Sequence, residues 1–196
     1  MKYLKMLGLA AVAAMALMAI TAGSASATTL EVGGAATNSS VSITATIAAG
    51  TSALLKDEFG TTTDTCLKSE VKGATEGTFT GATVGGKVGT LTFEECTHTT
   101  KVDANGSLSI AWTSGTNGEV KSSGAEVTVQ STFFGATALC KTGTGTKIGT
   151  ATGVKEGNAT IDINATVNCG ILGSSSWTGT YSVTTPSGKE GLGVTS

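Results

Sequence analysis

Apolar and polar residues alternate along several parts of this chain, and such alternation is typical of strands with one buried face. The clearest stretch runs from Ile161 to Cys169, where every second residue is apolar and polar residues lie between them. Shorter rows with the same period are Val41–Ile47, Val88–Phe93, Leu108–Trp112, Val127–Val129 and Trp177–Val183. The pattern predicts about ten strands and an all-β fold.

Turn signals separate these rows. Asn105-Gly106 lies between Thr99–Val102 and Ser107–Trp112, and Asn117-Gly118 follows soon after. Asn-Gly between alternating stretches is a strong hairpin signal, so we expect a hairpin turn at Asn105-Gly106. The only stretch that could form a helical turn is Thr51–Glu58, which is too short to change the fold class.

About ten antiparallel strands fit either a β-sandwich or a closed β-barrel. We expect an antiparallel β-sandwich, because hairpins braced by disulfides need only two facing sheets, and the closed antiparallel barrel is the alternative. One irregularity is visible within a predicted strand. Cys96 is out of phase with Leu91 and Phe93, which predicts a β-bulge near Glu94 and Glu95.

Residues 1–27 have the three parts of a secretory signal peptide. Lys2 and Lys5 precede an apolar run over residues 7–20, and the small residues Ala25-Ser26-Ala27 follow. The apolar run is shorter than the roughly 20 residues that a membrane-spanning helix needs. We therefore predict cleavage after Ala27, secretion to the extracellular space or cell wall, and no membrane span in the mature protein.

The predicted mature chain, residues 28–196, is long enough for a single all-β domain with a hydrophobic core. We expect residues 28–40 to be a flexible lead-in to that domain. Without Lys2 and Lys5, the mature chain has 10 Lys against 14 acidic residues, and it has no Arg. This balance disfavours nucleic acid as a partner, because phosphate contacts dominate affinity for nucleic acids.

Four cysteines are expected to form structural disulfides, because an exported protein meets an oxidising environment: Cys66, Cys96, Cys140 and Cys169. Three pairings are possible. We favour Cys66–Cys96 and Cys140–Cys169, since both loops are of similar length and each contains a Gly-Thr-x-Thr-Gly run. Closing each loop would stabilise the fold by about 3–4 kcal/mol. A zinc site is disfavoured, because close Cys-x-x-Cys pairs are missing and His98 is the sole histidine.

No catalytic constellation is recognisable in the sequence. His98 is the only candidate for the general base of a serine hydrolase, but the chain has no Gly-x-Ser-x-Gly nucleophile elbow. The acids Asp57-Glu58, Asp64 and Glu94-Glu95 could act on glycans only if two of them converged, and neighbours on a strand point to opposite faces. Asp103–Gly106 begins like a calcium loop but lacks its later ligands. We expect a non-enzymatic protein with no cofactor and no metal site.

Two tryptophans offer a different chemistry. Trp112 and Trp177 could stack on sugars at a carbohydrate-binding face. Both are in phase with the aliphatic residues of their rows, and this phase favours burial in the core.

Five segments carry a resemblance: Asp64-Thr65-Cys66, Leu91–Thr97, Gly124–Val129, Ala159–Ala165 and Trp177–Tyr181. In these segments the chain resembles a set of uncharacterised exported β-rich proteins of soil actinobacteria. The resemblance covers most of residues 60–196. It implies secretion and a shared β fold, and it brings no catalytic residues.

These observations favour a secreted or cell-wall-associated protein that acts as a structural, adhesion or extracellular binding module. Cell-surface polysaccharide or self-association would be its contacts. Two alternatives stay open. One is an exported carboxylate-based glycan hydrolase, and the other is a soluble carrier of a small apolar ligand, which needs a pocket larger than side chains fill.

Overall fold

A computed structural model of the chain describes residues 27–76, 81–131, 136–170, 173–188 and 190–196. The predicted signal peptide, apart from Ala27, lies outside these residues. The described part of the chain is built from strands and their connections, which confirms the all-β prediction.

The strands, in chain order, are β1 Thr29–Val32, β2 Ala35–Thr37, β3 Ser42–Ile47, β4 Ala53–Lys56, β5 Thr62–Thr75, β6 Val84–Cys96, β7 Thr99–Asn105, β8 Ser107–Ser114, β9 Asn117–Ser122, β10 Glu126–Ser131, β11 Ala136–Lys141, β12 Lys147–Thr152, β13 Ala159–Asn168, β14 Ser174–Thr184 and β15 Leu192–Thr195.

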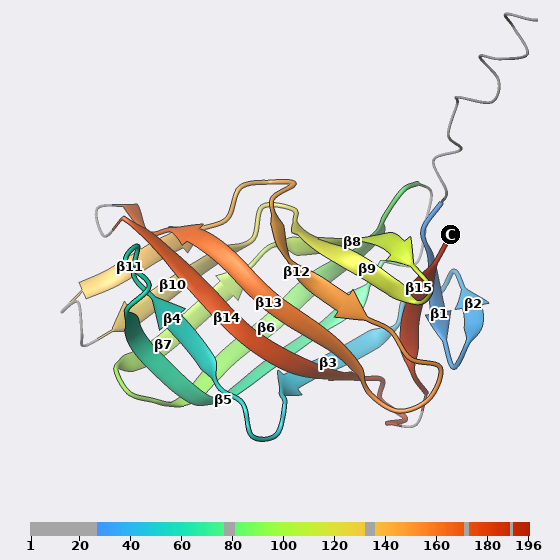
Figure 1. Ribbon diagram of the computed structural model, residues 1–196, viewed down its shortest axis with the longest axis horizontal. Coiled ribbons are helices and arrows are strands. Elements are labelled where there is room, and N and C mark those ends of the chain that lie inside the picture. The colour runs from blue at the N-terminus through green and yellow to red at the C-terminus, as the bar shows by residue number, and fades with distance from the viewer. Residues whose placement is uncertain (1–26, 77–80, 132–135, 171–172, 189) are drawn as a thin grey trace, which may run out of the picture.

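Eight of these strands form one closed antiparallel barrel. Each strand pairs with the next in the order β3, β5, β6, β8, β9, β12, β13 and β14. β14 then pairs with β3 and closes the ring. The strands run as a meander around the axis (Figure 1).

Four further strands lengthen the barrel wall toward one end. β4 continues the position of β3, because it also lies between β14 and β5. On the opposite side β10 pairs with β7 and β11, and β11 pairs with β13 at Lys141 and Asn168. We call this end, formed by β4, β7, β10 and β11, the rim; it lies at the left of Figure 1.

The antiparallel, disulfide-stapled character of the fold agrees with the sequence, and of the two architectures considered, the closed barrel is the one found. The two long strands β13 and β14 decide this outcome. β14 pairs with β13 along one edge and with β3 and β4 along the other, so no free sheet edge remains there. The alternation of apolar and polar residues predicts which face of a strand is buried. The same alternation occurs in the strands of a sandwich and of a barrel, so it does not distinguish the two folds.

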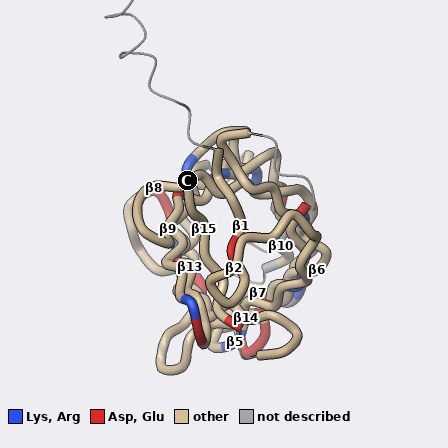
Figure 2. Tube along the Cα trace, turned by 90° about the vertical axis from the view of Figure 1, so that its right-hand side faces the viewer, with Lys and Arg blue, Asp and Glu red and all other residues tan. Residues whose placement is uncertain are grey.

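Residues 28–40, predicted to be a flexible lead-in, instead contribute two strands to a cap. β1 pairs with β2 and with the C-terminal strand β15, and this small sheet lies across the end opposite the rim (Figures 1 and 2). Leu30, Leu192 and Val194 of the cap join the main hydrophobic core. Thr28 is buried as well, and its hydroxyl donates to Ala82 O at 2.6 Å.

The predicted hairpin at Asn105-Gly106 is wrong. β7 and β8 follow one another along the same side of the barrel, and β7 pairs with β10 whereas β8 pairs with β9. Gly106 has a φ of 113°, and a Cβ there would lie 2.6 Å from the Cα of Ala125. The Asn-Gly signal therefore marks a close approach of backbones within a broken strand, where only glycine fits.

Other local predictions also need correction. The turn between β8 and β9 lies at Gly115-Thr116, two residues before Asn117-Gly118. The stretch considered as a helical turn contains the strand β4. No register shift occurs near Glu94; the shift between β5 and β6 lies at Lys72 and Gly73. The change of phase before Cys96 is made by Glu95, whose backbone is left-handed with a φ of 55°.

The alternation itself is confirmed at β13. Ile163, Ala165, Val167 and Cys169 are buried, and the polar residues between them are exposed. Ile163 and Ala165 belong to the main core with the inward side chains of the other strands, whereas Val167 and Cys169 form a second cluster with Cys140. The ion pairs, such as Lys68–Glu95 and Lys141–Glu126, lie on the outside of the wall with partly exposed side chains. Figure 2 views the resulting ring of strands from the capped end.

The cap should contribute measurably to stability, and two Leu→Ala substitutions test this. Leu30 in β1 is 5% exposed and Leu67 in β5 is 58% exposed. We expect Leu30→Ala to lower the free energy of unfolding in urea by about 2–5 kcal/mol, because it leaves a cavity under the cap. Leu67→Ala should change it by less than about 0.5 kcal/mol. Equal effects of the two substitutions would contradict a cap that packs on the barrel.

Candidate functional site

The interior of the barrel contains a cavity of about 140 Å³, which we call the lumen cavity. Its lining comes from every strand of the ring and includes these aliphatic side chains: Ile43, Ala45, Val84, Val120, Ile163 and Ala165. Several of these side chains are short, because Ala and Val occupy positions where longer residues would reach the barrel axis. The barrel therefore encloses apolar space that its own side chains leave empty.

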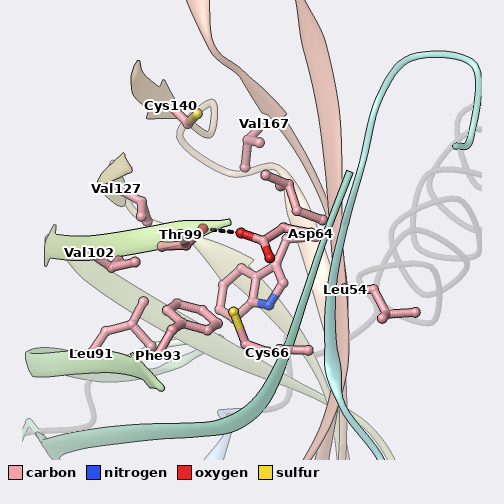
Figure 3. Close-up of a pocket in the computed structure, with 13 residues that line it drawn as sticks. Leu54, Asp64, Cys66, Leu91, Phe93, Thr99, Val102, Val127, Cys140 and Val167 are labelled. Carbon is pink, nitrogen blue, oxygen red and sulfur yellow. Dashed lines mark hydrogen bonds between the residues drawn. The ribbon is translucent and has the colours of Figure 1, made fainter. Parts of the chain in front are cut away.

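A second cavity of about 60 Å³, the rim cavity, lies next to the lumen cavity at the rim. Five residues line both: Leu91, Val127, Cys140, Val167 and Trp177. Figure 3 shows the side chains of the rim cavity, which come from strands on all sides of the barrel. The two cavities thus adjoin one another along the barrel, with these five side chains at their boundary.

Three aromatic residues lie along one side of this boundary. The ring of Trp177 is 5.8 Å from that of Phe93 and 6.1 Å from that of Tyr181, and both contacts are edge-to-face. Such pairs prefer this geometry because the edge of one ring is positive and the face of the other is negative. Trp177 packs against the core, as its phase predicts, and its indole Nε1 is buried without a hydrogen-bond partner among the described residues.

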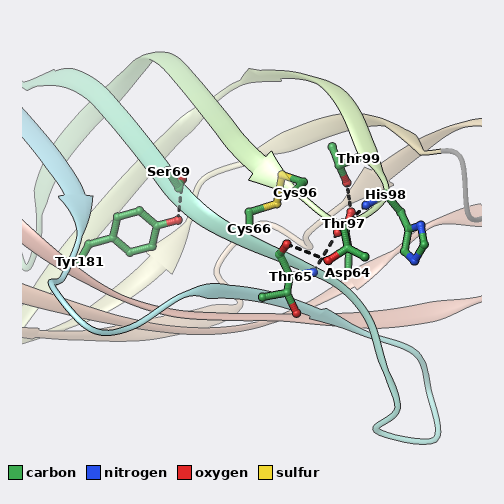
Figure 4. Close-up of a disulfide and its surroundings, with 9 residues drawn as sticks. All are labelled: Asp64, Thr65, Cys66, Ser69, Cys96, Thr97, His98, Thr99 and Tyr181. Carbon is green, nitrogen blue, oxygen red and sulfur yellow. Dashed lines mark hydrogen bonds between the residues drawn. A yellow bond between two sulfur atoms is a disulfide. The ribbon is translucent and has the colours of Figure 1, made fainter.

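Tyr181 is a buried polar residue whose hydroxyl is paired. It donates at 2.9 Å to Ser69 Oγ of β5, the strand on the other side of β3 (Figure 4). Burial raises the pKa of Tyr181 to about 12, because the phenolate would be poorly solvated, and the neighbouring Ser69 hydroxyl and Trp177 indole oppose this rise.

Both disulfides lie at the rim. The structure joins Cys66 to Cys96 and Cys140 to Cys169, which is the favoured pairing. Cys66 and Cys140 line the rim cavity. The first bridge links β5 directly to β6, and the second links β11 to the end of β13 (Figure 4 shows the first). The rim is therefore fixed covalently on two sides.

Asp64 adds a polar clamp beside the first disulfide. It is only 4% exposed. Its Oδ1 accepts from the backbone N–H groups of Thr65 and His98, at 2.8 and 3.0 Å, and its Oδ2 accepts from the Thr99 hydroxyl (Figure 4). These bonds hold the turn between β6 and β7 against β5. Every one of these donors comes from the protein itself, so the carboxylate is a structural group.

The other sequence candidates are dispersed. Asp57 lies in the exposed loop after β4 and accepts from the N–H groups of Phe59 and Thr61. Glu94 and Glu95 are exposed on β6, and Glu95 pairs with Lys68. His98 is half-buried in the turn between β6 and β7, where its backbone N–H serves Asp64. Asp103 lies in the strand β7 and pairs with Thr128 of β10, so residues 103–106 do not form a calcium-binding loop.

Two further findings apply to residues 27–76, 81–131, 136–170, 173–188 and 190–196. Across these ranges, no group of three or more His, Cys, Asp and Glu side chains is placed to hold a metal ion. Within the same part of the chain, no helix has the length and hydropathy needed to cross a membrane.

Sequence reasoning missed the two features that define this site. The lumen cavity depends on barrel closure, which alternation does not reveal. The buried role of Asp64 depends on its position two residues before Cys66 in a paired strand, and a carboxylate so close to a disulfide cysteine was the only available signal.

Comparison with known proteins gives no further assignment: no family model matches the chain, and neither a curated protein nor a solved structure matches it.

Tyr181 should ionise at unusually high pH in the folded protein. The absorbance of its phenolate, taken as the difference between wild type and Tyr181→Phe, should show a midpoint near pH 12, against about 10 after unfolding. Because the unfolded state loses this proton first, stability should fall as pH rises from about 10 to 12, and Tyr181→Phe should lack that component. A midpoint near 10 in the folded protein would contradict burial of the hydroxyl.

The Asp64 clamp can be tested by Asp64→Asn. The amide keeps one acceptor oxygen but cannot accept on its nitrogen, so one donor is left unpaired. We expect a loss of about 1–3 kcal/mol in the free energy of unfolding. Asp162→Asn is the matched control, because Asp162 is exposed and, among the described residues, accepts a single side-chain hydrogen bond, from the Thr180 hydroxyl. If both substitutions were equally mild, the clamp would contribute nothing specific.

Proposed function

We propose that this protein binds a small apolar molecule in the lumen of its barrel. The observation that carries the proposal is the cavity of about 140 Å³ inside the barrel, whose lining is mostly aliphatic and aromatic. Small-molecule sites in proteins are concave, mostly apolar and largely preformed, and the mouths and interiors of β-barrels are among their usual places. The lumen cavity has these properties without any conformational change.

Cavity size narrows the class of ligand. An engineered cavity of about 150 Å³, lined by aliphatic and aromatic side chains, stays dry and binds benzene. A ligand of roughly that size fits the lumen cavity, and the adjoining rim cavity of about 60 Å³ gives room for a short extension. Charged ligands are disfavoured, because an ion would lose its hydration in a mostly apolar cavity, and the one carboxylate of the rim cavity, Asp64, is already bonded to the protein's own donors.

The place of action in this proposal is outside the cytoplasm. Two disulfides, both at the rim, are typical of proteins in oxidising compartments. The predicted signal peptide supports the same compartment. The carrier hypothesis, weighed from the sequence as an alternative, is therefore our leading function, and the structural or adhesion role stays a prediction from the sequence.

Toluene is a suitable first probe, measured by its effect on the melting temperature of the purified, oxidised protein. A ligand that binds only the folded state raises the free energy of unfolding, and once its concentration exceeds its Kd, this increase grows with the logarithm of the concentration. We expect a concentration-dependent rise for the wild type. Ala165→Leu should weaken binding by about tenfold or more, because the added methyl groups occupy the lumen. Ala165 is 1% exposed and lines the cavity.

The matched control is Thr166→Leu, which adds a similar side chain to the exposed outer face of the same strand. It should bind toluene as the wild type does. If Ala165→Leu does not fold, Ala45→Leu can be used in its place, because Ala45 on β3 lines the same cavity. No stabilisation of the wild type by toluene, or equal stabilisation of the lumen-filled variants, would refute binding in the lumen.

A further inference from the structure

The buried indole N–H of Trp177 is the one polar side-chain group in the described residues that is fully buried and unpaired. Leaving a buried donor without an acceptor costs about 1–3 kcal/mol, so native proteins contain few such groups. Trp177 lines both the rim cavity and the lumen cavity. The side chain that carries the unpaired donor thus lies at the boundary of the space that we propose to hold a ligand.

Neighbouring polar groups are already engaged. The Tyr181 hydroxyl, beside the Trp177 ring, donates its proton to Ser69. Its oxygen is close enough to the indole for the indole to lower the pKa of Tyr181, but it lies outside hydrogen-bond geometry with Nε1–H. Elsewhere in the barrel, on β9, the buried Ser122 hydroxyl accepts from the Ala125 N–H at 3.0 Å and from the Thr142 hydroxyl at 2.5 Å. The protein satisfies these hydroxyls with its own atoms and leaves the indole N–H without a partner.

A water molecule is a poor partner for this donor. Buried waters are held by two to four polar groups, whereas the side chains shared by the two cavities are otherwise apolar: Leu91, Val127, Cys140 and Val167. Asp64 and Thr99 also line the rim cavity, but they are hydrogen-bonded to each other, so a water at the indole N–H would find few further bonds to replace those of bulk solvent. A ligand that brings both an apolar body and one acceptor satisfies the site better.

We infer that the ligand of the lumen carries one uncharged hydrogen-bond acceptor, such as a carbonyl or ether oxygen, which accepts from Nε1–H of Trp177. This inference rests on the proposed function and specifies its ligand class as a small ketone, aldehyde or ether. The apolar body would fill the lumen cavity, and the oxygen would lie at the boundary with the rim cavity.

The test compares two ligands of the same shape, cyclohexanone and methylenecyclohexane, which differ in whether the ring bears C=O or C=CH₂. The affinity of each for the full chain is measured by thermal shift and calorimetry, in wild type and in Trp177→Phe. The ratio of the two affinities removes differences in cavity volume caused by the substitution. We expect the preference for the ketone to fall by about tenfold in Trp177→Phe, as expected for loss of one hydrogen bond.

Trp112 supplies a control within the same molecule. Its Nε1–H donates to Gly115 O at 2.9 Å, outside both cavities. In nitrogen-15 NMR spectra of the wild type, cyclohexanone should move the indole proton of Trp177 downfield and leave that of Trp112 in place. Trp112→Phe assigns the two signals and should leave the ketone preference unchanged. This measurement needs no folding of Trp177→Phe.

Each outcome separates the inference from the proposed function. If neither ligand binds, the proposed function fails and the inference fails with it. If both bind, the ratio is equal in wild type and Trp177→Phe, and the indole signal does not move downfield, then the lumen binds ligands but the assigned hydrogen bond is overturned. A long-lived water detected on the indole proton of the ligand-bound protein would also overturn it.

Discussion

The pairing of β14 with strands on both of its edges is the constraint on which the rest of the structure depends. Along one edge β14 follows β13 over ten residue pairs, from Ser174 to Val183, and along the other it meets β3 and then β4. This double pairing turns a meander into a closed wall and leaves no edge along β14 for another chain to extend. It also fixes which side chains face inward, since a slip of one residue would turn an apolar row outward.

Closure of the barrel brings the apolar faces of its strands together around an interior space. An open sheet would have to be covered by a second layer, and the interdigitating side chains of two sheets would fill the volume between them. A barrel of eight strands is just wide enough for side chains to fill its interior or to leave room for one small ligand. Here Ala45, Val120 and Ala165 face the axis, and their small volume leaves the room.

The sequence predicted the strands better than their arrangement. Alternation located the buried row of β13, and similar loop lengths favoured the cysteine pairing that the structure contains, because both features are local or depend on covalent geometry. Closure of the sheet into a barrel could not be predicted from the sequence, because apolar and polar residues alternate with a period of two in the strands of a sandwich and of a barrel alike. The hairpin predicted at Asn105-Gly106 was wrong for a related reason. Glycine is suited both to a hairpin turn and to a close contact between backbones, and the sequence does not show that Ala125 lies against Gly106. The indole of Trp177 was predicted to be buried, but whether a buried donor has a partner depends on strands distant in sequence.

An empty lumen has an energetic consequence that connects it to the rim. At about 24 cal/mol per Å³, a cavity of about 140 Å³ destabilises a fold by roughly 3 kcal/mol, and an unpaired buried donor adds about 1–3 kcal/mol. Each disulfide contributes a stabilisation of about 3–4 kcal/mol, so two bridges are large enough to offset both terms. Their position strengthens the argument, because Cys66 and Cys140 lie beside the cavity rather than in distant loops. The covalent bridges thus allow the barrel to keep an unfilled interior and an unpaired indole N–H, which are the two features that a small ligand with one acceptor would complete.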